Sequence, residues 1–520
     1  MNNWERFKLA ELAVRVGSGA TPKGGKNAYP TTGVPLIRSM NVHFDGFRKD
    51  GIVFLDDEQA NDLNGATVQA MDVLLNITGA SIGRVTIAPQ DMDGARVNQH
   101  VCIIRPKPAA NPRFLSHFLA SPVMQRVITE QQVGVTRQAL TKGMILAFDV
   151  GLPPLAEQVR IVDEIEKQFT RLDAGVAALR RAEANLKRYK AAVLKAAVEG
   201  WLTERWRAEH PDVEPASELL KRILTERRRR WEQSELAKMQ TKGKPPTDDR
   251  WKIKYDEPIA PDPDTLFPLP TGWTWATIDQ LLDRGEYGTS VKCLPESVGV
   301  PVLRIPNIVE QEIDLANLKY ATAEPNGWPE CKLVPGDLLV CRTNGSLDLL
   351  GKTAAVREHL DGDYAFASYL IRLRLVMVDT LPVFVHHVFG SQHGRNFIEG
   401  HAASSAGQHN ISLSTLQRFV VPLPPLPECK AIIESIEEKL GFASTLRAAT
   451  RSNVRRADRL RQSILKRAFE GKLVPQDPTD EPASVLLDRI RAERQSRPDR
   501  RERTGRKNLP RRVAARRTAG

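Results

Sequence analysis

The tripeptide Gly-Lys-Thr at residues 351–353 matches the end of a loop that binds nucleotide phosphates. Such a loop needs another glycine five positions before the first residue of the tripeptide, so that backbone N–H groups can surround the phosphate. That position is Ser346, and the nearest glycine, Gly345, misses it by one. The glycine-rich stretch at residues 17–27 also fails, because Ala20 stands where glycine is needed. The sequence therefore argues against ATP binding.

Five histidines gather in the second half of the chain and raise the question of a metal site: His386, His387, His393, His401 and His409. They lack HExxH spacing, and no Cys/His ligand pattern joins them, so surface or core histidines are the better interpretation. The Asn-Pro-Pro-Tyr and Asp-Pro-Pro-Tyr tetrapeptides of amino-methyltransferases are absent from the sequence, and its carboxylates follow no nucleophile pattern. We therefore expect no catalytic residue and no metal site in this chain.

The cysteines and the hydropathy indicate a cytoplasmic protein. The five cysteines are odd in number and lack CxxC spacing, which is typical of reduced thiols rather than of disulfides or a zinc site: Cys102, Cys293, Cys331, Cys341 and Cys429. No run of 18 apolar residues occurs, so we expect no membrane span. The first residues, MNNWERFKLAEL, do not resemble a secretory signal.

The elements that must position any functional side chain include a long segment that occurs twice. Residues 152–202 and 423–473 align without a gap, and both begin with Leu-Pro-Pro-Leu and contain Glu-Gly near the end. In each copy apolar residues recur at steps of three and four, which predicts a helix. Prolines fit the start of the first helix, and Gly200 is placed to end it. A repeat of this length indicates two copies of one unit.

Each predicted helix has about 45 residues and would be roughly 65 Å long at a rise of ~1.5 Å per residue. Its narrow apolar stripe needs a partner, and the other copy is the obvious one, giving a two-helix coiled coil. The alternative is that each helix packs separately on a globular domain. Four arginines interrupt the second stripe and are expected on a solvated face: Arg447, Arg451, Arg455 and Arg456.

The globular segments that precede the helices are also related. VPLIRSMN at residues 34–41 corresponds to VPVLRIPN at residues 300–307, and DVLL at 72–75 corresponds to DLLV at 337–340. In the first segment, strands are expected at Val34–Ile37, Ile52–Leu55, Val73–Ile77, Val85–Ile87 and Val101–Ile104, and helices at Pro112–Ala120 and Val123–Glu130. Both segments should therefore be mixed α/β globules, each followed by its long helix.

Between the two repeats, residues 203–265 form a connector. We expect a helix at Glu214–Arg230, followed by a mobile, Pro- and charge-rich stretch at 242–264. The net charge of +12 is concentrated at the other end of the chain, because residues 495–520 carry ten Arg and Lys against two acids, or +8. This basic tail should be disordered. Non-specific attachment to phosphates and a solubilising role suit it about equally well.

With these paired patterns, the chain resembles the specificity subunits of type I restriction–modification enzymes over about residues 1–490. Motifs that carry the resemblance are GSGATP (17–22), NITGASIGR (76–84), ARVNQHVCIIRP (95–106), GVTRQALTKGMI (134–145), LRIPNI (303–308), GDLLVCRTNGSLDLLGK (336–352) and GQHNISLSTL (407–416). The connector and the tail depart from the family's shared pattern.

The resemblance implies an α+β architecture: two α/β target-recognition domains joined by two long antiparallel coiled-coil helices, with a pseudo-twofold internal repeat. The expected boundaries are 1–150 for the first domain, 151–202 for its helix, 203–265 for the connector, 266–421 for the second domain, 422–494 for the distal long helix and a short helix, and 495–520 for the tail.

The resemblance also implies a non-catalytic subunit that reads double-stranded DNA. Each domain would read one half of a bipartite, asymmetric site, and the helix pair would set the spacer. Two methyltransferase subunits would assemble on it, together with two restriction and translocase subunits. S-adenosylmethionine, ATP and Mg would be bound by those partners, and no cofactor by this chain.

DNA contacts are expected from polar loop residues: Lys23, Lys26, Arg38, Ser81, Arg84, Arg137 and Gln138 in the first domain, and Arg304, Asn344, Ser346, Lys352, Gln408, His409 and Asn410 in the second. Arg38 and Arg304 are shared by domains that should read different bases. Phosphate contact or internal salt bridging therefore suits them better than base readout.

Other shared residues have structural interpretations. Asn41 and Asn307 should hold turns through side-chain to backbone hydrogen bonds. The paired glycines Gly79, Gly83, Gly345 and Gly351 should permit tight turns rather than a close approach of DNA.

Two other functions compete with DNA reading. A coiled-coil scaffold that joins proteins would explain the long helices but not two related, diverged globules. A self-sufficient enzyme such as a nuclease is opposed by the missing motifs.

Overall fold

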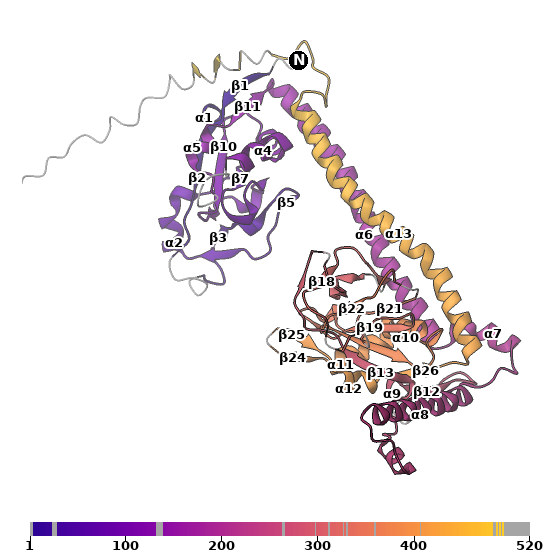
Figure 1. The fold of residues 1–520 in the computed structure, drawn as a ribbon. Helices are drawn as coiled ribbons and strands as arrows, with labels where there is room; N and C mark the ends of the chain where they lie inside the picture. The colour runs from indigo at the N-terminus through magenta and orange to yellow at the C-terminus, as the bar shows by residue number, and fades with distance from the viewer. Residues whose placement is uncertain are drawn as a thin grey trace, which may run out of the picture. The chain divides into compact units, whose positions relative to one another are not determined.

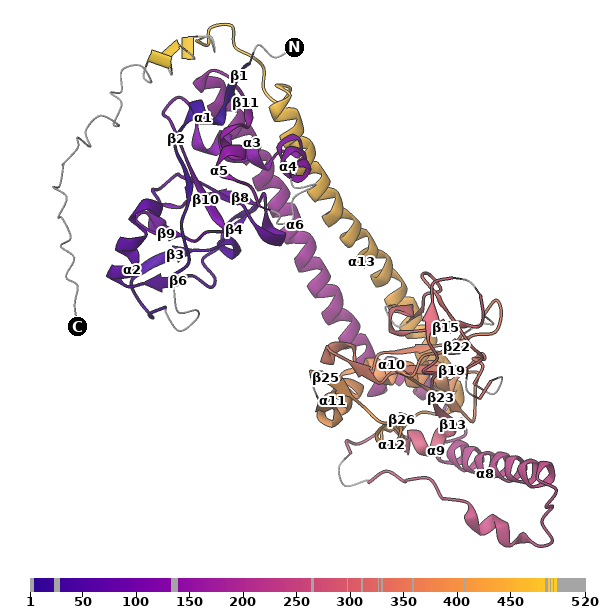
Figure 2. The same ribbon diagram turned by 60° about the vertical axis from the view of Figure 1, so that its left-hand side comes forward.

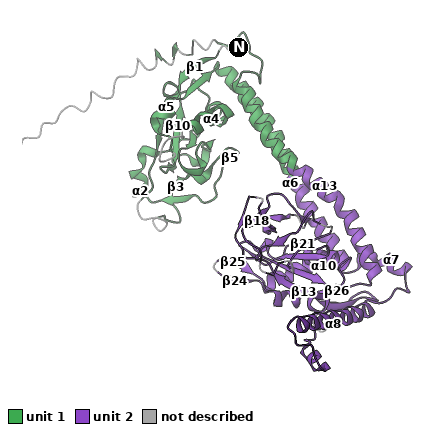
Figure 3. Cartoon of the chain, in the orientation of Figure 1, with its two compact units in different colours: residues 1–179, 452–520 green, residues 180–451 purple. Residues whose placement is uncertain are grey.

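The computed structural model describes residues 4–22, 29–131, 139–262, 266–296, 298–309, 312–325, 327–328, 331–357, 360–405, 407–481, 485–486, 488–489 and 491–492. The chain divides into two compact units, which Figure 3 distinguishes by colour. Unit 1 comprises residues 1–179 and 452–520, and unit 2 comprises residues 180–451. Each unit thus combines one globule with part of each long helix, α6 (Leu155–Val198) and α13 (Leu426–Phe469).

The globule of unit 1 contains eleven strands and five short α-helices in its described part (Figure 1). In chain order these are β1 (Glu5–Lys8), α1 (Leu9–Leu12), β2 (Ala13–Ser18), β3 (Val34–Ile37), β4 (Val42–His43), β5 (Gly46–Phe47), β6 (Val53–Leu55), α2 (Asp57–Asp62), β7 (Val73–Asn76), β8 (Val85–Ile87), β9 (Arg96–Val97), β10 (Val101–Pro106), α3 (Pro112–Ala120), α4 (Pro122–Glu130), α5 (Lys142–Leu146) and β11 (Asp149–Leu152).

Unit 2 follows the connector helices α7 (Glu204–Glu209) and α8 (Ala216–Thr241) and repeats the main elements of this order, with additional strands and without a counterpart of α2. Its globule contains β12 (Thr274–Thr277), α9 (Ile278–Leu281), β13 (Leu282–Tyr287), β14 (Cys293–Leu294), β15 (Pro301–Leu303), β16 (Ile308–Val309), β17 (Glu312–Ile313), β18 (Lys319–Ala321), β19 (Asp337–Cys341), β20 (Thr343–Asn344), β21 (Thr353–Ala355), β22 (Ala365–Phe366), β23 (Leu370–Leu375), α10 (Leu381–Gly390), α11 (Gln392–His401), β24 (Ala403–Ser405), β25 (Gln408–Asn410), α12 (Leu413–Gln417) and β26 (Val420–Leu423).

The two globules share one sheet topology. The central sheet has the strand order β2-β10-β7-β8 in unit 1 and β13-β23-β19-β21 in unit 2, and all neighbours are antiparallel. In both units one strand outside the central sheet pairs in parallel with a later strand, β3 with β9 and β15 with β22. The internal repeat predicted from the sequence is therefore present in the fold.

Local sequence explains why matching helices form. Asn111 accepts hydrogen bonds from the N–H groups of the first turn of α3, where Pro112 begins the helix. Ser121 caps α4, and the equivalent Ser391 caps α11. Apolar faces of α3 and α10 then pack on the central sheets, as Phe114 does in unit 1. All five strands and both helices predicted for the first globule are confirmed, with ends that differ by at most two residues.

In unit 1 the described parts of α6 and α13 contact each other with opposite chain directions. Arg461 of α13 forms an ion pair with Asp173 of α6, and its guanidinium lies 4.3 Å from the ring centre of Phe169. Nearer the start of α6, Arg160 pairs with Asp480 at 2.6 Å. Residue numbers rise along one segment and fall along the other, so the pair is antiparallel.

In unit 2 the same two helices also pair. Arg447 and Arg451 of α13 both reach Glu183 of α6, at 3.8 and 3.3 Å, and Val193 and Ile436 are buried in one apolar cluster. These two arginines were expected on a solvated face, and they remain partly exposed while pairing with the other helix. The alternative, in which each long helix packs separately on a globular domain, is therefore wrong (Figures 1 and 2).

A buried glutamate ties each globule to its helix. In unit 1 the indole N–H of Trp4 donates to Glu157 at 3.1 Å, and burial raises the pKa of that carboxyl group. In unit 2 the Trp273 indole donates to Glu428 at 2.9 Å. Glu428 is fully buried, and its other oxygen accepts bonds from Thr203, at 2.6 Å, and from Arg207.

The connector departs from the expected linker. The helix predicted at Glu214–Arg230 runs from Ala216 to Thr241 as α8, because its charged second half forms pairs such as Arg230–Glu226 at 2.8 Å. Part of the stretch expected to be a mobile linker folds back as a 3₁₀ helix at Asp249–Lys254, and Trp251 stacks on Trp231 of α8. That aromatic contact was not foreseen from its composition.

Two expected boundaries also fall inside strands. The limit at 150/151 cuts β11, and the limit at 421/422 cuts β26, because these last strands pair with the first strands of their globules, β1 and β12. Among the described residues, none of the helices is long and apolar enough to cross a membrane. The basic tail at 495–520 lies outside the described residues.

Replacing Glu428 by alanine should destabilise unit 2 by about 3–5 kcal/mol, because Arg207 would lose its partner in a buried site. Urea unfolding followed by tryptophan fluorescence measures this, since all eight tryptophans except Trp4 lie in unit 2. Glu438→Ala, at an exposed position of the same helix, should change stability by less than about 0.5 kcal/mol. Equal effects of the two substitutions would contradict the role given to Glu428.

The stability of unit 2 should also fall in acid because of His387. Burial, with Arg357 and Lys190 nearby, lowers the pKa of this imidazole to about 3. Its pKa in the unfolded chain is about 6.5, so the unfolded state binds one more proton between these values. The free energy of unfolding should then drop by up to about 1.4 kcal/mol per pH unit as the pH falls through that window.

His387→Leu should make the pH dependence of urea unfolding shallower by about one proton in that window. His401→Leu is the matched control, because His401 is exposed in the neighbouring helix α11. An unchanged slope in the His387 variant would show that this imidazole is not held neutral by burial.

Candidate nucleic-acid interface

The two globules have equivalent backbone contacts at the start of the loop that follows β7 in unit 1 and β19 in unit 2. The Ile77 N–H donates to the His100 carbonyl at 3.0 Å, and the Arg342 N–H donates to the Tyr369 carbonyl at 2.9 Å. Both positions thus have the same backbone environment but unlike side chains. Such positions can differ in function without disturbing the shared fold.

In unit 1 this loop borders a hollow of about 480 Å³. Its lining is mostly small and polar: Ser39, Met40, Thr78, Gly79, Ala80, Ser81, Arg84 and His100. Two of the predicted contacts, Ser81 and Arg84, lie together here. The Arg84 guanidinium approaches His43 Nδ1 at 3.5 Å, and Thr78 Oγ1 is hydrogen-bonded to His100 Nδ1. The lining of the hollow therefore includes several hydrogen-bonding side chains.

In unit 2 the corresponding loop is extended by a three-stranded sheet of order β20-β25-β24. Asn344 lies opposite His409 in this sheet, and Asn410 accepts a 2.6 Å hydrogen bond from Thr343 Oγ1. The Asn344 side-chain oxygen accepts from the Ser346 N–H at 2.9 Å. The neighbouring predicted residues are exposed Gln408 in β25 and half-buried Lys352, whose carbonyl accepts from the Cys341 N–H at 2.8 Å. The structure thus brings Asn344, Ser346, Gln408, His409 and Asn410 together at this small sheet.

Arg38 and Arg304 have the same internal role in the two units. Arg38 donates through Nη2 to the carbonyl of Gly51, and Arg304 donates to that of Asn317 at 2.8 Å. Each guanidinium therefore fixes the loop that lies 13 residues further along the chain. A structural role of this kind agrees with the presence of arginine at this position in both globules. Contact of either one with DNA stays a prediction.

The turns assigned to Asn41 and Asn307 are confirmed. Asn41 Oδ1 accepts from the backbone N–H three residues earlier at 2.9 Å, and Nδ2 donates to the carbonyls of Arg48 and Asp50. Asn307 makes the same three hydrogen bonds, with the carbonyls of Asp314 and Ala316 as acceptors. Both amides are buried, so each replaces the water that these backbone groups have lost.

The glycine interpretation holds at three of four positions. Gly79, Gly83 and Gly351 have positive φ angles of 71°, 83° and 71°, which favour glycine. A Cβ at Gly351 would also lie 2.6 Å from Ile398 of α11. Gly345 is the exception, because its φ is not in the left-handed region and a Cβ there would lie no closer than 3.8 Å to its surroundings.

Four predicted contacts lie outside the described residues: Lys23, Lys26, Arg137 and Gln138. Sequence analysis, in turn, missed Arg342 and the aromatic residues near it, Tyr287 and Tyr369. A signal was present, because the alignment of residues 72–75 with 337–340, continued for two more residues, pairs Ile77 with Arg342. The replacement of an aliphatic residue by arginine at a repeated position marks a difference between the globules.

A charged frame supports the loops in both units. Arg105 forms two hydrogen bonds with Asp72, at 2.8 and 2.7 Å, and Arg374 forms two with Asp337, at 2.7 and 2.8 Å. These hydrogen bonds raise the pKa of both guanidinium groups. The aspartates begin the segments that form β7 and β19, so the pairs fix the strands from which the candidate loops emerge.

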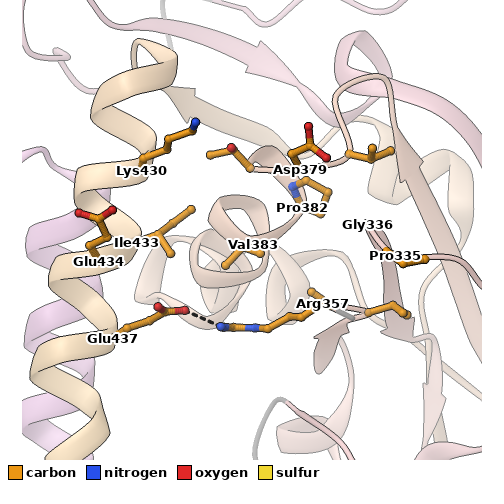
Figure 4. A pocket seen from close by; sticks show the side chains of 14 residues that line it. Pro335, Gly336, Arg357, Asp379, Pro382, Val383, Lys430, Ile433, Glu434 and Glu437 are labelled. Atoms are coloured by element: carbon orange, nitrogen blue, oxygen red, sulfur yellow. Dashed lines mark hydrogen bonds and ion pairs between the residues drawn. The ribbon is translucent and has the colours of Figure 1, made fainter. Parts of the chain in front are cut away.

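A separate hollow of about 390 Å³ lies between the globule of unit 2 and helix α13. Figure 4 shows Lys430, Ile433 and Glu434 of α13 on one side and Pro335 and Gly336 on the other. An ion pair between Arg357 and Glu437 closes one edge. None of the predicted DNA contacts lines this hollow, so we assign it to the junction between globule and helix.

Fold and site together define a class: a duplicated chain with two equivalent α/β globules, each docked on a pair of long helices, with different polar groups at equivalent loops. The type I restriction modification DNA specificity domain is the family model that matches residues 1–177.

Relatives extend the similarity over most of the chain. The EcoKI specificity subunit of Escherichia coli strain K12 is 24% identical over 479 residues, which cover 89% of each chain. The EcoBI specificity subunit of Escherichia coli is 25% identical over 506 residues, covering 95% of this chain and 93% of the relative. The chain is thus similar to type I restriction enzyme specificity subunits over most of its length, and its first third matches the specificity-domain model.

A chain from a solved structure of a type I restriction–modification system shares the fold. Its TM-score is 0.57 at 19% sequence identity, and the match covers 90% of this chain and 98% of the other. The predicted α+β class, with two related globules and two long helices, is confirmed by this likeness and by the element order of the chain.

Proposed function

We propose that this chain gives a type I restriction–modification complex its DNA sequence specificity, with each globule reading one half of a bipartite site. The observation that carries the proposal is the pairing of a common frame with unlike side chains. Ile77 and Arg342 share their backbone hydrogen bonds, as do His100 and Tyr369. A duplicated scaffold with different polar groups at the same loops suits two readers of different bases.

We also propose that the helix pair sets the spacer between the half-sites. A helix of 44 residues is about 65 Å long, and an antiparallel partner stiffens it. The distance between the two readers would then fix how many base pairs separate the half-sites. Bases between the half-sites would then be spanned rather than read.

The same helices are the proposed docking surface for two methyltransferase subunits. Support comes from apolar side chains that α13 leaves in solvent, above all Phe442, which is 75% exposed, and Leu446 one turn later. Two restriction and translocase subunits would complete the complex. In this proposal the chain acts in the cytoplasm and is not catalytic by itself, while S-adenosylmethionine, ATP and Mg serve the partners.

A pure protein scaffold is the competing function, and it would need the helices but not the differences between the globules. Exchanging residues 1–150 with those of a relative that has another target tests between the two. We expect one half of the methylated motif to change and the other half to stay, as read by genome-wide methylation sequencing. A change in both halves, or in neither, would refute the modular reading of DNA.

Lengthening the helix pair tests the spacer. Seven residues inserted after Ala184 in α6 and after Arg447 in α13 would add about 10 Å, or roughly two turns, to both helices at matching levels. The spacer should then grow by about three base pairs at ~3.4 Å each. An insertion in α6 alone is the control, because it shifts one helix against the other and should abolish methylation. Full methylation at the original spacing would contradict the proposal.

A further inference from the structure

Arg342 occupies a place in unit 2 that the backbone fixes on both sides. Its N–H donates to the Tyr369 carbonyl, and its own carbonyl accepts from the Ile411 N–H, both at 2.9 Å. It follows β19 directly and is one residue from β20, which carries Asn344 opposite His409. The side chain therefore starts from a rigid point beside the polar residues of this globule.

An aromatic ring holds the guanidinium. The Arg342 Cζ atom lies 4.8 Å from the ring centre of Tyr287. That tyrosine is itself held, because its hydroxyl oxygen accepts a 3.0 Å hydrogen bond from the Leu413 N–H. Stacking orients the guanidinium plane without consuming its N–H donors, which lie around the edge of that plane.

Most of those donors are left available. Nη1 makes one long hydrogen bond, 3.4 Å, to the Ser368 carbonyl, and Nε is buried without a partner. Within the described residues Nη2 makes no hydrogen bond, so its two N–H groups and the second one of Nη1 are the donors that remain. Within the described part of the chain, Arg342 forms no ion pair with a carboxylate, whereas Arg372 and Arg374 of the same sheet pair with Glu286 and Asp337. An arginine with a fixed plane and free donors is prepared to meet an acceptor from outside the chain.

The equivalent position in unit 1 shows whether the fold itself needs an arginine here. The equivalent residue in unit 1 is Ile77, which is only 9% exposed and packs in the core. The fold therefore does not require arginine here. Tyr287 and Tyr369, which surround Arg342, are 47% and 56% exposed, so this place is at the surface.

We propose that Arg342 is a specificity-determining residue that reads one guanine in the half-site of unit 2, with Tyr287 as its positioning residue. The guanidinium fork matches the O6 and N7 acceptors that guanine presents in the major groove, and no other base presents this pair. The inference rests on the proposed function, because it assumes that unit 2 reads DNA, and it adds which residue reads and which base is read.

The test starts from the methylated motif of the native host, determined by genome-wide methylation sequencing. The half-site of unit 2 is the half that survives exchange of residues 1–150, and it should contain a G·C pair. Arg342→Gln, Arg342→Lys and Arg342→Ile should each relax or alter one base position of that half. Arg342→Ile copies the residue that the other globule accommodates, so a folding failure of one variant leaves the test intact.

Binding of the purified complex to duplexes that differ at this position should show the same result. Substituting the guanine should weaken wild-type binding about 10- to 100-fold and binding of the Arg342 variants by less than about threefold. Tyr287→Phe, which keeps the ring, should retain more of the preference for the guanine-containing duplex than Tyr287→Ala. Arg418→Gln removes an exposed charge elsewhere in unit 2 and should leave the motif unchanged.

Two outcomes would overturn the proposal. One is an unchanged motif in all three Arg342 variants. The other is a uniform loss of affinity for every sequence with a shallower salt dependence, which is the behaviour of a phosphate contact. Failure of the proposed function looks different, because the wild-type host would then show no bipartite motif.

Discussion

The structure depends on one kind of contact, a buried glutamate at the start of each long helix that accepts the indole N–H of the globule's first tryptophan. Glu157 does this for Trp4, and Glu428 does it for Trp273. A buried carboxylate is costly unless every oxygen is bonded, so the contact fixes one orientation of globule on helix. Glu428 adds Arg207 and Thr203, which also ties the end of α6 to the start of α13 within unit 2.

Comparison of the two globules separates the contacts that both need for folding from the positions at which their side chains differ. The Asp–Arg pairs, the Asn-held turns and the Arg38 and Arg304 loop contacts recur in both, so they maintain the fold. Ile77 and Arg342 do not match, and neither do His100 and Tyr369, although their backbone hydrogen bonds are the same. Recognition of different bases needs such positions, because the side chains that contact the bases must differ while the backbone frame that holds them stays the same. Mutations in the frame should accordingly affect stability, and mutations at the unlike positions should affect the target.

Much of the fold was predictable because its signals are long or repeated. The helices follow from apolar periodicity over many turns, and the strands of the first globule from short apolar runs between turns. The length of α8 and the Trp231–Trp251 stack were missed, since aromatic contacts between a helix and a following loop have no fixed spacing. Part of the candidate site was found from polar loops. Arg342 was missed although the repeat pairs it with Ile77, because its contact with the ring of Tyr287, 55 positions earlier, has no signature in the sequence.

The central claim is that two unlike readers, joined by one helix pair, give the chain a split target. Genome-wide methylation sequencing of the host with and without this gene measures that claim directly. The account predicts an asymmetric motif of two short halves separated by unread bases, present with the gene and absent without it. A single continuous or palindromic motif, or one that persists after deletion of the gene, would contradict it.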